Sequence, residues 1–316
     1  MKERIIWLDN LKGTLIFLVV LGHCIQFSSP NPDKDVLFNF IYSFHMPLFM
    51  CLSGFACYKQ NLKWNIVYRR FIQLIIPFFS FNAINAFLTG HNYLSYFYNP
   101  QIGLWFLWVL FFITILQISV SKLSIRCRFG EEFMTLLIFI TLFGIGKATH
   151  LSIFAVDMIV SFWLYYAIGY FLRKHEKVLL ELKKTYIGAV LLICFFIVSL
   201  TYNRSVVPGF ISFVPHLVYV RLVPIIGILT IMFFGCKYCN KNISLLNAMG
   251  GGTLGVYAIH LQFFVKPEVF NLNIDTIFLY YLYNVVLATA LTAISYALTI
   301  VLSKSKYSSL LLLGKT

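Results

Sequence analysis

Charged residues are scarce in this 316-residue sequence: they make up 11% of it, and acidic residues number only 11. Soluble proteins carry about 25% charged residues. The scarcity is matched by 60% hydrophobic and 18% aromatic residues and by a mean hydropathy of +0.83. Water cannot be the main solvent of such a chain, which excludes a soluble enzyme, a disordered chain and a nucleic-acid-binding protein. We therefore expect an all-α, polytopic protein of the lipid bilayer.

Signals for disulfides, metals and secretory cleavage are also lacking. The seven cysteines are odd in number and lie mostly in apolar stretches, where a thiol packs as a small hydrophobe. Cys236 and Cys239 form a single CxxC with no second pair to complete a zinc site. No small-residue cleavage site follows Phe27, so the first apolar segment is expected to be a retained helix. We expect no disulfide framework and no metal.

Apolar runs of membrane-spanning length divide the chain. A bilayer-spanning helix needs about 20 apolar residues. The runs cover residues 10–28, 36–57, 66–88, 103–120, 132–148, 151–172, 184–203, 210–235, 253–271 and 274–302. They predict ten helices in a single integral membrane domain, residues 1–316, with the longest loops at about 89–102 and 236–252. The weakest division falls near Thr149 and His150, where a nine-helix alternative arises.

Basic residues indicate the orientation of these spans. The sequence has 25 lysines and arginines and a formal net charge of +14. With ten spans, 20 of these 25 fall in alternate loops that include both ends of the chain, and the other five are Lys34, Lys147, Arg204, Arg221 and Lys266. Because cytoplasmic loops collect lysine and arginine, we expect both termini to be cytoplasmic and the protein to cross the cell inner (cytoplasmic) membrane several times. The alternation favours ten helices over nine.

Polar residues of the first span are predicted to share one helical face. Lys12 and His23 are eleven residues apart, which on an α-helix is three turns plus roughly 20°. Asp9 precedes Lys12 by about one turn, so the stripe extends about 16 Å from the cytoplasmic interface. Ionisable groups inside a membrane are costly and usually functional. We predict that Asp9, Lys12 and His23 line a cavity and take part in catalysis.

Each of these candidates has a structural alternative. His23 could bond only a neighbouring carbonyl, although burial in mid-membrane favours a functional role, in which a neutral imidazole accepts a proton or attacks a carbonyl. Lys12 could be a topology anchor, but its alignment with His23 favours anion binding. His45 lies close to Pro47, which predicts a kinked second helix, and either bonds the disturbed backbone or acts directly. Arg69 and Arg70 suit phosphate recognition as well as anchoring.

Taken together, several short motifs resemble the acyltransferase-3 family of integral membrane acyltransferases. They are found at residues 4–13, 21–23, 44–55, 69–77, 104–107 and 252–260, in family order over about four fifths of the chain. The loop-poor form with Lys12 in the first motif is most similar to the branch of fucose 4-O-acetylase-like sugar O-acetyltransferases. Many members have arginine where Lys12 stands, and some carry a glutamate near the Trp105 segment that this sequence lacks. The partner of His23 therefore stays unidentified at this level.

The resemblance implies acyl transfer, usually of acetyl, from cytoplasmic acyl-CoA to a hydroxyl of a sugar or polysaccharide. It implies that acetyl-CoA is the donor, that His23 is the general base or a transient acyl acceptor, and that Lys12 is the basic residue of the same motif. From their positions inside the first two spans, we also place Asp9 and His45 in the catalytic group. Lys12, Arg69 and Arg70 would bind the CoA phosphates, and Trp105 would stack on a sugar or on adenine. The sequence does not determine the oligomeric state, and a homo-oligomer is one possibility.

Two other classes compete with the enzyme. A transporter or flippase for a glycan or solute would use the intramembrane histidines to relay protons, and Pro47, Pro215 and Pro224 suit broken helices. No inverted repeat is evident, and a transporter gives no reason for basic anchors below an intramembrane histidine. An inactive structural subunit would leave the buried polar stripe as an unexplained cost. The sequence favours the acyltransferase.

Overall fold

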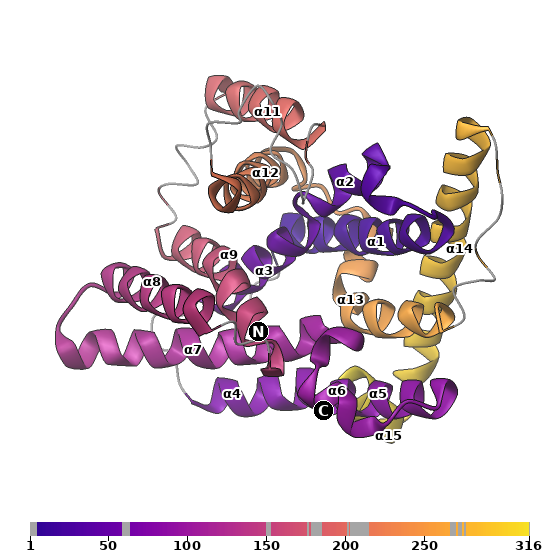
Figure 1. Cartoon of the computed structure of the whole chain (residues 1–316), viewed down its shortest axis with the longest axis horizontal. Helices are drawn as coiled ribbons and strands as arrows, with labels where there is room; N and C mark the ends of the chain where they lie inside the picture. Colours follow the sequence, from indigo (N-terminus) through magenta and orange to yellow (C-terminus); the bar gives the residue numbers. More distant parts are fainter. Residues whose placement is uncertain are drawn as a thin grey trace. The chain divides into compact units, whose positions relative to one another are not determined.

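The chain folds into helices joined by turns and short connections, as the computed structural model in Figure 1 shows. The structure describes residues 5–58, 64–149, 153–175, 177, 185–200, 202, 215–265, 270, 274 and 276–315. No strand occurs among these residues, which confirms the predicted all-α class. Several basic residues used to predict orientation lie outside the described residues: Lys2, Arg4, Lys59, Lys63, Lys183, Lys184, Arg204 and Lys266.

Eight helical segments in the described part of the chain are long and apolar enough to cross a membrane. They are Ile6–Ser28, Val36–Cys57, Asn65–Thr89, Trp105–Cys127, Glu131–Thr149, Ile153–Lys174, His216–Tyr238 and Ile277–Leu302. The prediction of a polytopic membrane protein is therefore confirmed. Helices α11 (Thr185–Leu200) and α13 (Ser244–Phe263) occupy the two other predicted stretches. The count of ten spans, the single domain and the cytoplasmic termini stay predictions.

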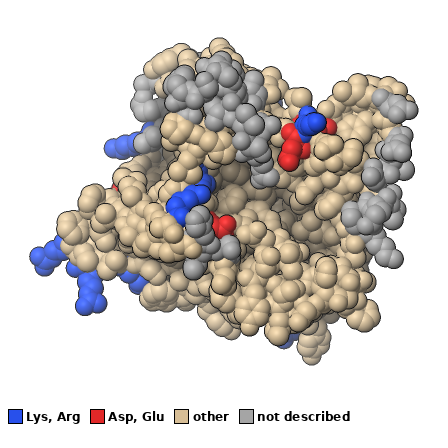
Figure 2. All heavy atoms as spheres, viewed as in Figure 1, with Lys and Arg blue, Asp and Glu red and all other residues tan. Residues whose placement is uncertain are grey.

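Apolar side chains cover much of the outer surface. Helix α8 (Glu131–Thr149) exposes Phe133, Leu136 and Ile140, and α14 (Ile277–Leu302) exposes Phe278 and Val286. Figure 2 shows that uncharged residues dominate the visible face and that lysine and arginine gather at a few places. Large exposed apolar areas are rare on soluble monomers. This surface suits contact with lipid tails.

The described chain divides into two compact units. The first comprises residues 1–49 and 175–299. Its helices are α1 (Ile6–Ser28), the 3-10 turn η1 (Pro32–Lys34), α2 (Val36–Tyr42), α11, α12 (His216–Tyr238), α13 and most of α14. Helix α1 packs most extensively against α13, and α11 packs against α12. The core of the first unit therefore lies around α1.

Glycines allow α1 and α13 to approach closely. A Cβ atom added to Gly13 of α1 would collide with the backbone of Leu246, and one added to Gly250 of α13 would collide with the backbone of Asp9. In a membrane, small residues of this kind let helix backbones meet and gain dispersion contacts. The sequence thus sets the distance between the two helices near their N-terminal ends.

The second unit comprises residues 50–174 and 300–316. It holds the end of α3 (His45–Cys57), α4 (Asn65–Arg70), the π-helical turn η2 (Phe71–Ile75), α5 (Ile76–Thr89), α6 (Tyr93–Tyr98), η3 (Pro100–Ile102), α7 (Trp105–Cys127), α8, η4 (Ile153–Ala155), α9 (Val156–Lys174) and α15 (Lys306–Leu313). Helices α7, α8 and α9 pack on one another, and α15 packs on α5. Inside this core, Trp163 Nε1 donates a hydrogen bond to Gln117 Oε1 at 2.9 Å.

Two sequence predictions about helix boundaries are wrong. Residues 244–252, predicted to lie in a loop, form the start of α13, because Gly250 sits where α13 touches α1 and the packing outweighs the poor helix propensity of glycine. The second predicted helix is interrupted at Ser43 and Phe44, ahead of Pro47. Pro47 falls in the first turn of α3, where a missing N–H costs little, so it does not kink a continuous helix.

Alanine at Gly250 tests the contact between α1 and α13. We expect Gly250→Ala to destabilise the protein by about 1–3 kcal/mol, the usual range for an overpacked core. The matched control is Gly144→Ala in α8, where an added Cβ meets open space and alanine is the better helix former. Tryptophan fluorescence during thermal unfolding of the purified protein measures both changes. A Gly250→Ala midpoint equal to or above that of wild type would contradict the close contact.

Candidate functional site

Helix α1 carries three of the predicted site residues on one continuous segment. It runs from Ile6 to Ser28 without interruption, so the spacing that aligns Lys12 with His23 is preserved. Lys12 Nζ lies 4.0 Å from Asp9 Oδ1, and both side chains are partly exposed. An ion pair this long and this exposed contributes little to stability. Asp9 and Lys12 are therefore neighbours at one end of α1, as predicted.

His23 meets a second histidine from α13. The Nδ1 atom of His23 lies 2.8 Å from Nε2 of His260. The ring planes differ by 17° and the ring centroids are 5.1 Å apart, close to the largest separation that this nitrogen–nitrogen distance allows for two imidazoles. The rings thus meet edge to edge, with the hydrogen bond near the plane of both. His260 is completely buried, whereas His23 is partly exposed.

The other nitrogen of each ring has a different environment. His260 Nδ1 lies 2.9 Å from the carbonyl oxygen of Val256, one turn earlier in α13. Within the described residues, His23 Nε2 forms no hydrogen bond, so this nitrogen is the one that could meet a reacting group. A general base must first of all lie within hydrogen-bond distance of the proton that it removes.

Aromatic rings border the histidine pair. The ring of Phe27 lies 6.2 Å from that of His23, and the ring of Phe264 lies 6.4 Å from it, edge-on. Phe27 and Phe264 stack on each other with centroids 4.7 Å apart. These apolar rings lower the polarity of the surroundings of the pair, which strengthens electrostatic interactions there.

Beside the break between α2 and α3 lies His45. The ring is 3% exposed, and its Nδ1 donates to the carbonyl oxygen of Ile41 at 2.8 Å. This bond supports the structural alternative, in which His45 satisfies a carbonyl at the disturbed backbone. The neighbouring Tyr42 has its ring 4.6 Å from that of His45 and donates from its hydroxyl to Gln26 Oε1 at 2.7 Å. His45 thus connects to α1 through Tyr42, and its catalytic role stays a prediction.

A network of asparagines holds the end of α1 that carries Lys12. Asn10 Nδ2 donates to the carbonyl oxygens of Cys239 and Lys241, each at 2.8 Å. Asn247 Nδ2 in turn donates to Asn10 Oδ1 at 2.6 Å. Asn10 and Asn247 are buried, so each bond avoids the cost of an unsatisfied polar group. The connection between α12 and α13 is thereby tied to α1.

The remaining predicted residues belong to the second unit. Arg69 and Arg70 end α4, immediately before the π-helical turn η2, a feature often associated with functional sites. Arg69 is exposed, and Arg70 Nη1 lies 3.5 Å from Gln73 Oε1. Trp105 begins α7 and is partly exposed, with its ring 5.2 Å from that of Phe162.

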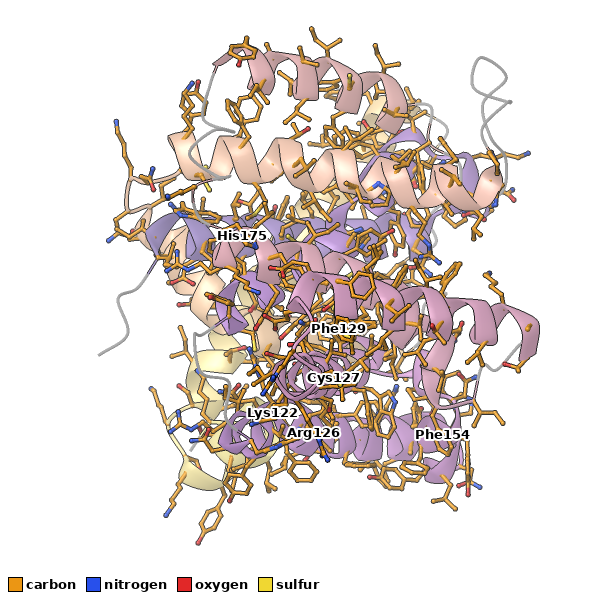
Figure 3. The ribbon with its side chains drawn as sticks, turned by 90° about the vertical axis from the view of Figure 1, so that its left-hand side faces the viewer. Lys122, Arg126, Cys127, Phe129, Phe154 and His175 are labelled. Carbon is orange, nitrogen blue, oxygen red and sulfur yellow. The ribbon has the colours of Figure 1, made fainter. Side chains whose placement is uncertain are left out.

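Figure 3 labels Lys122, Arg126 and Cys127, which lie at the C-terminal end of α7, and Phe129, which follows it. Near the N-terminal end of α7, Trp108 Nε1 donates to the carbonyl oxygen of Phe154 at 2.9 Å.

The structure therefore brings some predicted residues together and adds one. Asp9, Lys12, His23 and His45 belong to the first unit, and Arg69, Arg70 and Trp105 to the second. From the sequence, His260 could equally pack or cap a helix or shape the site, and nothing in one sequence shows that this residue, 237 positions away, faces His23. The sequence feature that points to His260 is its position inside a predicted membrane span, where a histidine is costly.

Comparisons with known proteins agree with the motifs. Nodulation protein NolL of Sinorhizobium fredii is 33% identical over 149 residues, 39% of this chain and 39% of that protein. Nodulation protein NolL of Mesorhizobium japonicum is 37% identical over 83 residues, 24% of this chain and 22% of that protein. The chain thus aligns with less than half the length of either relative. No solved structure matches the chain.

The match to a family is far more extensive than either alignment. The sequence model of the acyltransferase-3 family, described as an acyltransferase domain, matches residues 5–304. This range includes every residue of the candidate site. The chain therefore belongs to the acyltransferase-3 family.

Proposed function

We propose that this membrane acyltransferase is an O-acetyltransferase that moves an acetyl group from cytoplasmic acetyl-CoA to a hydroxyl of a sugar or cell-surface polysaccharide. The observation that carries the proposal is His23, a histidine on α1 whose Nδ1 faces His260 and whose Nε2 has no partner among the described residues. Membership of an acyltransferase family supplies the reaction class. The inner membrane as its location, and the likeness to the fucose 4-O-acetylase branch, belong to this proposal.

In the proposed reaction, His23 handles one proton. Its Nε2 accepts the proton of the acceptor hydroxyl while the oxygen attacks the thioester carbonyl. The carbon–sulfur bond then breaks, and the imidazolium returns the proton to the departing CoA thiolate. In a second route, His23 Nε2 attacks the thioester, CoA leaves as a thiolate and an acyl-histidine forms; the hydroxyl then attacks the acyl group, the carbon–nitrogen bond breaks, and the hydroxyl proton passes through His23 to the thiolate. Both routes need the same nitrogen with a lone pair.

Charged residues are assigned to the donor. Lys12, held beside Asp9 at one end of α1, would bind a CoA phosphate as a point charge. Arg69 and Arg70 would bind phosphate through their guanidinium groups, and Trp105 would stack on adenine or on a sugar. His45 is proposed to support α1 through Tyr42 and Gln26, in addition to any direct part in catalysis.

The assay that tests the function uses labelled acetyl-CoA, membranes that contain the protein, and candidate glycans. Transfer of label to a glycan, or slow hydrolysis of the donor, supports the transferase. Movement of a glycan or solute across the membrane without acylation would support the transporter alternative instead. Glycan mass spectrometry of a deletion strain identifies the acceptor by the loss of one acetyl mass.

Replacement of His23 tests its part in the chemistry. We expect His23→Ala to lower kcat by about 10²–10⁴-fold, the usual contribution of a general base, while membrane insertion and the elution profile stay normal. His91→Ala is the matched control because His91 is exposed in the connection between α5 and α6. Full activity of His23→Ala would exclude both proposed routes.

Neutral replacements of the arginines test the phosphate contacts. We expect Arg69→Gln and Arg70→Gln each to raise the KM for acetyl-CoA about tenfold with little change in kcat, because each removes a charge-assisted hydrogen bond made in the ground state and the transition state alike. Arg126→Gln, in the last turn of α7, removes the same charge from another helix end. If all three variants show the KM of wild type, Arg69 and Arg70 are membrane anchors only.

A further inference from the structure

His260 faces His23, the proposed base, from α13, a helix far from α1 in the sequence. Helix α13 packs along α1, closely at Gly13 and Gly250, and ten residues further along each helix the two rings meet. His260 is completely buried and contacts a backbone carbonyl on its far side. His23 Nδ1 and His260 Nε2 face each other, and His260 Nδ1 faces the Val256 carbonyl. From these contacts, the nitrogen that carries the hydrogen in each ring can be deduced.

The deduction begins at Val256. Its carbonyl oxygen only accepts hydrogen bonds, so the Nδ1 atom of His260, 2.9 Å away, must carry a hydrogen and donate it. The ring is completely buried, and no carboxylate contacts it within the described residues, so a charged form would be costly. A neutral imidazole that carries hydrogen on Nδ1 has a lone pair on Nε2. His260 Nε2 is therefore an acceptor.

The acceptor in turn sets the state of His23. Because His260 Nε2 accepts, His23 Nδ1 must donate across the 2.8 Å contact. Neutral His23 then has its lone pair on Nε2, the nitrogen that bonds no described residue. The near-planar geometry of the two rings suits this N–H···N bond, since the lone pair of an imidazole lies in the ring plane.

We infer that His260 is a positioning residue that holds His23 in the Nδ1-protonated tautomer, with Nε2 ready to accept the hydroxyl proton. The inference rests on the proposed function for its chemical meaning. When His23 Nε2 takes the proton, the Nδ1–H···Nε2 bond to His260 becomes charge-assisted and stabilises the imidazolium. The same proton then goes to the thiolate leaving group, and His260 ends as it began.

Nitrogen NMR reads the tautomer directly and does not depend on turnover. The full-length protein in lipid vesicles is labelled with ¹⁵N-histidine, and the signals of the seven histidines are assigned by single substitutions. We expect the His23 ring to be protonated at Nδ1 alone and, in His260→Leu, to become a mixture of both tautomers. A wild-type His23 protonated at Nε2 would overturn the inference.

Kinetics of two variants separate positioning from packing. We expect His260→Leu to lower kcat by about 100-fold, the lower end of what general-base catalysis contributes, without a change in the KM for acetyl-CoA. His260→Gln offers a side-chain oxygen as acceptor and should recover at least about a tenth of the wild-type kcat. The control, His91→Leu, removes an exposed histidine and should retain activity. Equal loss in the leucine and glutamine variants would overturn the acceptor role.

The two measurements distinguish failure of this inference from failure of the proposed function. If the wild-type protein transfers no acetyl group to any acceptor, the proposed function fails, yet the NMR result still decides whether His260 sets the tautomer. If His260→Leu does not fold, the wild-type tautomer and the glutamine variant provide the decision. Normal transfer by His260→Leu with His23 still protonated at Nδ1 would contradict the inference alone.

Discussion

Close contact between α1 and α13 is the constraint on which the candidate site depends. The hydrogen bond between His23 and His260 spans 2.8 Å, so a shift of about one ångström between the helices would break it. Gly13 and Gly250 remove the side chains that would hold the backbones apart. The bonds from Asn10 to the connection between α12 and α13 then fix how far α13 can slide along α1. Packing and polar bonds together place one imidazole against the other.

Hydropathy and helical periodicity predicted much of this molecule because each depends on residues close in the chain. Long apolar runs gave the all-helical membrane class, and the eleven-residue spacing placed Lys12 and His23 on one uninterrupted helix. The predicted start of α13 was wrong because three successive glycines, Gly250 to Gly252, indicate a loop unless the packing of the neighbouring helix is known. The position of the break before His45 was also missed, since Pro47 seemed the natural place for it. Both errors concern tertiary packing, which local patterns do not contain.

The partner of His23 could not be predicted for a related reason. In soluble enzymes with a Ser-His-Asp triad, a carboxylate orients the catalytic histidine. This sequence has only 11 acidic residues, and the segment around Trp105 has no glutamate. A histidine 237 residues away fills the position instead. Its identity depends on the register of two helices distant in sequence, so it becomes visible only when their packing is known.

A neutral partner is well suited to a base inside a membrane. A carboxylate beside His23 would be an anion in a poorly solvated site whenever His23 is uncharged, and a buried charge of that kind is expensive. An imidazole needs no counter-charge in the resting state, because its Nδ1 is satisfied by the carbonyl of Val256 and its Nε2 by His23. In the proposed reaction, charge develops only when the proton arrives on His23, where the hydrogen bonds to His260 and on to the Val256 carbonyl stabilise it. The pair thus orients the base at little electrostatic cost before substrate binds, which is the property that a preorganised site in lipid requires.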